Sequence, residues 1–78
     1  MSAKLKNEKD WVKVEVSSDG KTIYQGCPSI PMAKEDEEVW LIRKITIRET
    51  DGQVVDIKHT MNYANKWTDR KNLNYYYV

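Results

Sequence analysis

Aliphatic and polar residues alternate along the first part of the sequence. In WVKVEVSSDGKTIYQG, Val12, Val14 and Val16 are separated by charged and polar residues, which is the period of a half-buried β-strand. Asp19 and Gly20 follow, and both residue types tolerate a positive φ, so the pair predicts a tight turn. TIYQ then supplies the returning strand. This stretch therefore predicts an antiparallel hairpin.

The stretch VWLIRKITIRETDGQVVDIKHTM alternates over a greater length and predicts a second hairpin. One face of its first strand takes Val39, Leu41, Arg43, Ile45 and Ile47. The other face takes Trp40, Ile42, Lys44, Thr46 and Arg48. Asp51 and Gly52 predict the turn. The alternation then returns through Val55, Ile57, His59 and Met61.

The segments around the second hairpin predict loops and a short last element. Pro28 and Pro31 lack an amide donor, so GCPSIPMAKEDEE is predicted as a loop in which AKEDEE forms a helical turn or a solvated acidic face. TDRKNL predicts one helical turn capped by Thr68. The last residues predict a fifth strand, with Leu73, Tyr75 and Tyr77 on one face.

Together these elements predict an all-β protein. We expect a small antiparallel sheet or barrel of four to five strands, built from two hairpins, with at most one short helical turn. Its 78 residues make one domain at 11–78, preceded by a flexible N-terminal segment at 1–10. The predicted core consists of Val14, Trp40, Ile42, Ile45, Ile47, Val55, Ile57 and Leu73.

Composition removes several classes of function. The net charge of +1 gives no general argument for nucleic acid, and the single cysteine, Cys27, excludes an internal disulfide. The longest apolar run, VWLI, is far too short to span a membrane, and the N-terminus has no signal-peptide pattern. We expect a soluble intracellular chain.

The sequence offers little catalytic chemistry. His59 is the only histidine, and neither it nor Cys27 has a companion base or enough ligands for zinc. The consecutive acids at 35–38 lack the alternation and the turn glycine of a calcium loop. We therefore expect a protein that is not an enzyme and that binds no metal or cofactor.

Two binding surfaces remain as candidates. A single-stranded nucleic-acid binder combines basic residues with stacking aromatics, and the basic candidates are Arg43, Arg48, Lys66 and Lys71. Tyrosine and tryptophan are also enriched at protein interfaces, and a sheet edge invites pairing with another chain. The candidate protein interface consists of Trp67, Arg70, Tyr75, Tyr76 and Tyr77.

Two motifs of the C-terminal half resemble a family of short tailed-bacteriophage proteins encoded among or near the virion genes. The first is a Trp-x-Ile-Arg-Lys-Ile strand, matched by Trp40, Ile42, Arg43, Lys44 and Ile45. The second is an aromatic ending, matched by Asn65, Trp67, Asp69, Arg70, Leu73 and Tyr75. The chain has TMNYAN where the family usually has Ala-Asp-Gly before the aromatic, and its tail extends further, by Tyr76, Tyr77 and Val78.

Members of that family are mostly described as hypothetical or structural. The resemblance implies a minor virion component of the head, neck or tail, which docks on other virion proteins, or on itself, through sheet edges and aromatics. The alternative is a phage-encoded module that binds a host protein or single-stranded nucleic acid. These hypotheses place the protein in the virion or in the host cytoplasm.

Overall fold

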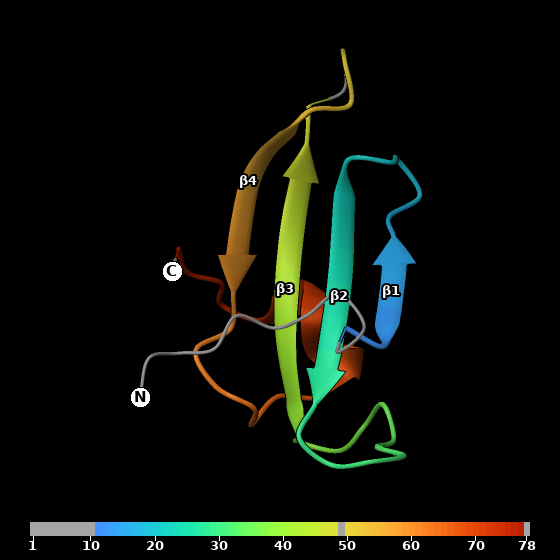
Figure 1. The fold of residues 1–78 in the computed structure, drawn as a ribbon, viewed down its shortest axis with the longest axis vertical. Helices are drawn as coiled ribbons and strands as arrows, with labels where there is room; N and C mark the ends of the chain where they lie inside the picture. The colour runs from blue at the N-terminus through green and yellow to red at the C-terminus, as the bar shows by residue number, and fades with distance from the viewer. Residues whose placement is uncertain (1–10, 49, 78) are drawn as a thin grey trace.

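The computed structural model describes residues 11–48 and 50–77, and a four-stranded antiparallel sheet is its main element (Figure 1). The strands follow chain order across the sheet, so each is hydrogen-bonded to its neighbours in sequence. They are β1 (Lys13–Val16), β2 (Thr22–Pro28), β3 (Trp40–Ile47) and β4 (Val54–His59), followed by the 3-10 helix η2 (Trp67–Asn72). The predicted all-β fold class is confirmed. The flexible segment predicted at 1–10 lies outside the described residues.

Both predicted turns form where the sequence places them. Gly20 and Gly52 have φ values of 72° and 71°, a left-handed conformation that glycine adopts without steric cost. Asp19 accepts hydrogen bonds from the Ser17 hydroxyl and the Lys21 amide, and Asp51 accepts one from the Gln53 amide. These local bonds fix the two hairpins.

β2 continues further than the sequence predicts. The loop was expected to begin at Gly26, but Gly26 pairs with Ile42, and the strand ends at Pro28 opposite Trp40. Proline is tolerated at this position because its missing amide donor falls at the end of the ladder. The added residues carry β2 along the whole length of β3.

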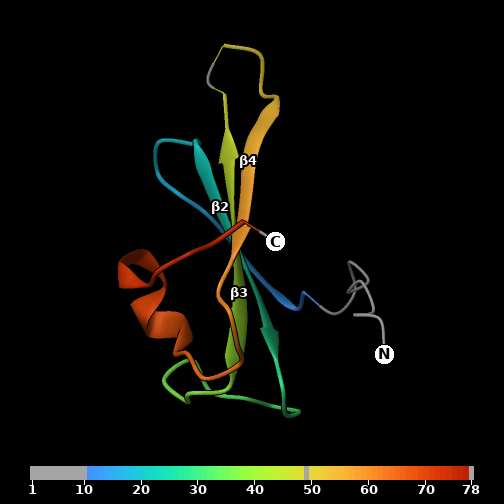
Figure 2. The ribbon, with the colours of Figure 1, turned by 90° about the vertical axis from the view of Figure 1, so that its left-hand side faces the viewer.

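The core lies on one face of the sheet, under η2 and the chain that follows it (Figure 2). Its buried members are Tyr24, Trp40, Ile42 and Trp67. Partly buried residues pack around them, namely Ala33, Val39, Leu73 and Tyr75. The predicted core roles of Trp40 and Ile42 are therefore confirmed, and Leu73 lies at the margin of the cluster.

The two tryptophans of this core require a glycine beneath them. The Trp40 and Trp67 rings lie 5.8 Å apart between centroids, at an angle of 48°. A Cβ atom on Gly26 would come within 2.8 Å of the Trp67 ring and 2.9 Å of the Trp40 ring. Gly26 therefore permits the indoles to pack directly on the β2 backbone.

On the other face of the sheet, Trp11 is buried against Arg43 and His59, while several predicted core residues of the same face are exposed in the described part of the chain. Val14 is 57% exposed, Ile57 is 43% exposed, and Val55 is also exposed. Ile45 and Ile47 are only partly buried. The core prediction is wrong for Val14, Val55 and Ile57, because η2 covers the face that carries Lys13 and Glu15 instead.

The C-terminal part differs from the prediction in two respects. Lys66, rather than Thr68, is the N-cap of η2 and makes no side-chain capping bond, while the Thr68 amide donates to the Glu35 carbonyl at 3.2 Å. The predicted fifth strand is reduced to a single antiparallel bridge, in which Tyr76 and His59 exchange two backbone hydrogen bonds.

Candidate functional site

One row of aliphatic side chains crosses the open face from edge to edge. The strand registers pair Val16 with Ile23, Ile23 with Ile45, and Ile45 with Ile57. Cross-strand partners share a face, so these four residues, one from each strand, form a continuous aliphatic row. Val16 is 56% exposed at one edge, and Ile57 is exposed at the other.

The row is the centre of a larger apolar surface. Val14 lies beside it on β1, and Ile47 pairs with the exposed Val54 beyond it. β1 contributes four residues, so four strands about 4.8 Å apart and four residues at about 3.3 Å each give a flat footprint of about 250 Å². The largest apolar patch of a typical monomer measures about 300–600 Å² and often binds a partner. The open face approaches that size.

A polar row borders the aliphatic row on the same face. Val14 pairs with Gln25, Gln25 with Arg43, and Arg43 with His59. Arg43 donates from Nε and Nη2 to Gln25 Oε1, the first at 2.6 Å. Its guanidinium carbon lies 4.5 Å from the centroid of the Trp11 ring. The positive charge is thus held by groups of its own chain. The aliphatic row and the polar row together form the open face, which consists of Val14, Val16, Ile23, Gln25, Arg43, Ile45, Ile57 and His59.

His59 completes this row as a packed residue. Its ring lies 5.9 Å from that of Trp11 in an edge-to-face arrangement. Burial, and then the charge of Arg43, lower the pKa of His59 below its usual 6.5, which favours the neutral ring at physiological pH. Within residues 11–48 and 50–77, no three His, Cys, Asp or Glu side chains are grouped to hold a metal ion.

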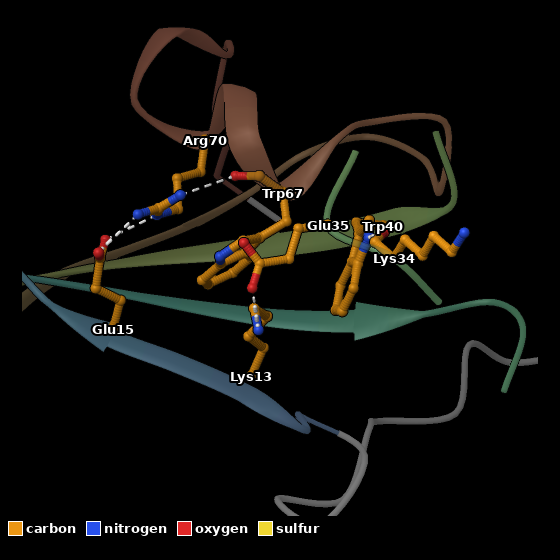
Figure 3. Close-up of polar contacts among 7 residues, drawn as sticks. All are labelled: Lys13, Glu15, Lys34, Glu35, Trp40, Trp67 and Arg70. Carbon is orange, nitrogen blue, oxygen red and sulfur yellow. Dashed lines mark hydrogen bonds and ion pairs between the residues drawn. The ribbon is translucent and has the colours of Figure 1, made fainter. Parts of the chain in front are cut away.

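Arg70 and Trp67, two of the candidate interface residues, belong to the covered face (Figure 3). Arg70 donates from Nε and Nη2 to the two Glu15 oxygens at 2.7 and 2.6 Å, and from Nη1 to the Trp67 carbonyl at 3.1 Å. The hydrogen bond from Arg70 lowers the pKa of Glu15, and the same bond raises that of Arg70. Arg70 therefore joins η2 to β1 rather than to another protein.

Two further contacts hold the loop before β3 on this face, and Figure 3 shows both pairs of residues. Lys13 Nζ lies 2.6 Å from Glu35 Oε2, and the Trp40 indole donates to the Lys34 carbonyl at 2.9 Å. These bonds connect the loop before β3 to both β1 and the core. They explain why the charged residues of β1 are half-buried while its valines are exposed.

The three tyrosines occupy different environments. Tyr75 is half-buried, its hydroxyl donates to the Arg70 carbonyl at 2.5 Å, and burial raises its pKa. Tyr76 and Tyr77 are 47% and 70% exposed. Lys58 Nζ lies 4.8 Å from the Tyr77 ring centroid. The candidate interface is therefore corrected: Trp67, Arg70 and Tyr75 have structural roles, and only Tyr76 and Tyr77 are accessible.

The basic candidates are not brought together on one surface. Arg43 lies on the open face, and Arg48 pairs with Asp51 at the tip of the second hairpin at 2.7 Å. Lys66 and Lys71 flank or lie within η2, on the opposite side of the sheet (Figure 2). The groove of basic and aromatic side chains expected of a single-stranded nucleic-acid binder is not formed by these four residues.

Sequence reasoning missed several residues that shape the site. Val16 and Ile23 belong to the aliphatic row, and their β-branched side chains at alternating positions were the available signal. Thr60 is buried after β4 and accepts a hydrogen bond from the Ile42 amide at 3.0 Å. Asn65 donates to the Trp40 carbonyl at 3.0 Å. No local sequence pattern predicts these last two hydrogen bonds, because each joins residues far apart in sequence.

Comparison with known proteins adds no relative. Among the described residues, the structure has no helix with the length and apolar character needed to cross a membrane. The chain matches no protein-family model, no curated protein and no solved structure.

Proposed function

We propose that the protein is a non-enzymatic docking subunit, a minor structural component of a bacteriophage virion in the head, neck or tail. Its docking surface is the open face of the sheet, and the phage assignment rests on the resemblance of the two sequence motifs. The single observation that supports docking is the aliphatic row of Val16, Ile23, Ile45 and Ile57, which crosses all four strands and is exposed at both of its ends.

The energetics of the row favour a partner. Water contact with apolar surface costs about 25 cal/mol for each Å², so an apolar face is normally buried against another layer. Here η2 covers the opposite face, and in the described part of the chain Val14, Val16 and Ile57 of the β-branched face are exposed. A docking partner would supply the missing layer. Such a role needs no reactive group, in keeping with the packed, self-contained environments of His59 and Arg43.

The edge of β4 offers an additional contact. β4 ends the sheet on one side, and the exposed Tyr76 bridges its last residue, His59. Tyr77 extends beyond this bridge next to Lys58. An extended segment of a partner can pair with such an edge, while the tyrosines provide contact area at low entropic cost. This is the edge-and-aromatic docking expected from the sequence, limited to two of its tyrosines.

The test uses purified particles of the phage that encodes the chain. Quantitative mass spectrometry is expected to find the protein in a whole-number copy count that fits the particle symmetry. Phage carrying Ile57→Lys are expected to lose it from the particle, whereas phage carrying Met61→Lys retain it. Met61 is exposed in the loop after β4 and is not one of the eight residues of the open face, so this control adds the same charge outside that set.

Two results would contradict the proposal. Absence of the wild-type protein from particles, with abundance in infected cells, would favour a module that binds a host protein. Equal incorporation of the Ile57→Lys and Met61→Lys variants would show that the open face is not the docking surface. Circular dichroism of both purified variants controls for folding.

A further inference from the structure

We infer that the turn around Met32, in the loop between β2 and β3, is a second docking surface, and that its occupant is a partner protein with an apolar pocket bordered by basic side chains. This contact lies outside the eight residues of the open face, and it rests on the proposed docking function. Three features support it: the backbone at Met32, the exposure of its side chain, and the charges of the same loop.

Met32 adopts a backbone conformation that most residues avoid. Its φ is 54°, and among the described residues it is the only one other than glycine with a positive φ. Pro31 and Met32 lie in a turn, and a positive φ after proline is typical of a type II turn, where glycine or asparagine usually follows. In other residues the Cβ atom crowds the next carbonyl oxygen in this conformation. The turn would therefore be more stable with asparagine at position 32.

The side chain of Met32 makes little contact with the rest of its own chain. It is 97% exposed, the highest value among the large apolar residues of the described part. Ile30 is 41% exposed, and Pro31 is exposed between them. Three consecutive apolar residues thus meet water at one turn, which is unfavourable. Contact with another molecule would offset both the strained backbone and the apolar exposure.

The loop that carries this turn is fixed on both sides of it. The Ser29 amide donates to the Val39 carbonyl at 2.9 Å, and the Trp40 indole donates to the Lys34 carbonyl at 2.9 Å. Both bonds attach the loop to the beginning of β3 and the residue before it. Met32 is therefore presented by a preformed turn, so little conformational entropy is lost when it binds.

The charges of the same loop select the class of partner. Of its four consecutive acids, Glu35 pairs with Lys13, and Glu37 accepts a hydrogen bond from the loop backbone at 2.7 Å. Asp36 and Glu38 are exposed and make no ion pair within the described chain. Nucleic acid and anionic membranes would repel this loop. A protein with a basic border around an apolar pocket complements it, and the flexible methionine side chain fits pockets of varied shape.

The test compares phage that carry Met32→Asn, Met32→Leu or Met61→Asn. Asparagine relieves the turn and removes the apolar side chain, so we expect its copy number in particles, measured by quantitative mass spectrometry, to fall about tenfold or more. Leucine keeps an apolar side chain on the same backbone and is expected to retain the wild-type copy number. Met61→Asn makes the same exchange at an exposed methionine outside this turn and is also expected to retain it.

Thermal denaturation of the purified proteins controls for folding. Met32→Asn is expected to melt about 4 °C above the wild type, because asparagine tolerates the positive φ. A more stable variant that is lost from particles has lost a contact with its partner. A melting temperature no higher than that of the wild type, or incorporation of Met32→Asn at the wild-type level, overturns the inference.

The outcomes separate this inference from the proposed function. If Met32→Asn is incorporated normally while Ile57→Lys is lost, the open face stands and the turn fails; the reverse result keeps the turn and removes the open face. If the wild type is absent from particles, the virion role fails, and a photoreactive residue at position 32 tests the turn in infected cells. A crosslink from position 32 but not from position 61, to an apolar site bordered by basic residues, supports the turn, and any other result overturns it.

Discussion

Trp40 and Ile57 are both large apolar residues of the second hairpin, yet they have different roles. Trp40 is 3% exposed between β2, β3 and η2, whereas Ile57 is nearly half-exposed on the open face. Truncation of a buried tryptophan costs about 3–5 kcal/mol, a large share of the stability of a domain this small. We expect Trp40→Ala to unfold the domain, and Ile57→Ala to lower the free energy of unfolding by less than about 1 kcal/mol.

Urea denaturation followed by far-ultraviolet circular dichroism measures both effects. A urea midpoint of Trp40→Ala equal to that of the wild type would show that the tryptophan cluster is not the core. A loss for Ile57→Ala as large as that for Trp40→Ala would show that the open face is buried in the isolated chain. The two substitutions thus report on the two faces of the same sheet.

His59 predicts how stability depends on pH near neutrality. Burial and Arg43 lower its pKa from 6.5, so the unfolded chain takes up the proton first as the pH falls. Stability falls with decreasing pH wherever the unfolded state binds more protons than the folded state. The free energy of unfolding is therefore expected to fall as the pH drops through 6.5. His59→Gln is expected to flatten this decrease between about pH 7.5 and pH 5.5, above the range of the carboxylates. Urea midpoints at several pH values test it, and an unchanged slope in the variant contradicts it.

At the level of single residues, the sequence predicts which residues share a face of a strand better than it predicts which face is covered. The alternation of Val12, Val14 and Val16 correctly places the valines on one face of the first hairpin. It does not say which face is covered, because that depends on η2 and on the bond from Arg70 to Glu15, which are 55 residues apart. A hydrophobic pattern identifies the face that benefits from burial, and in this chain that face remains exposed.

At the level of elements, locally determined features are predicted well. The turns at Gly20 and Gly52 need only a tolerant residue and flanking strands, so the hairpins follow from the sequence. The extent of β2 and the cap of η2 depend on partners elsewhere in the chain, such as Trp40 and Glu35. Pro28 and Thr68 were misleading for this reason: each has a local preference that the long-range contacts override.

The C-terminal segment gives an element-level prediction. Tyr75 anchors it through its hydroxyl bond to the Arg70 carbonyl, whereas Tyr77 is exposed. Tyr75→Phe leaves the carbonyl without this donor and is expected to lower the free energy of unfolding by about 1 kcal/mol. Tyr77→Phe is the matched control, with an expected change within about 0.5 kcal/mol. Thermal and urea denaturation measure the difference, and equal effects of the two would show that Tyr75 does not anchor the segment.

The whole molecule is a sheet covered on one face, and its native state should report this asymmetry. A dye such as anilinonaphthalene sulfonate fluoresces when it binds exposed apolar surface, and it usually marks loosely packed states. We expect the folded monomer at low concentration to enhance its fluorescence, Val16→Lys to reduce the signal, and Met61→Lys to leave it unchanged. A wild-type signal no higher than that of Val16→Lys would show that the aliphatic row is not accessible to ligands.

The position of the cover in the chain also has a consequence for biosynthesis. Trp67, Arg70 and Tyr75 follow all four strands in the sequence, so the ribosome releases the sheet before it releases the residues that protect it. During that interval both faces of the nascent sheet lack a cover, and unprotected sheet surfaces aggregate readily. Chains stalled before Trp67 should therefore bind chaperones, and release of the following nine residues should end that dependence.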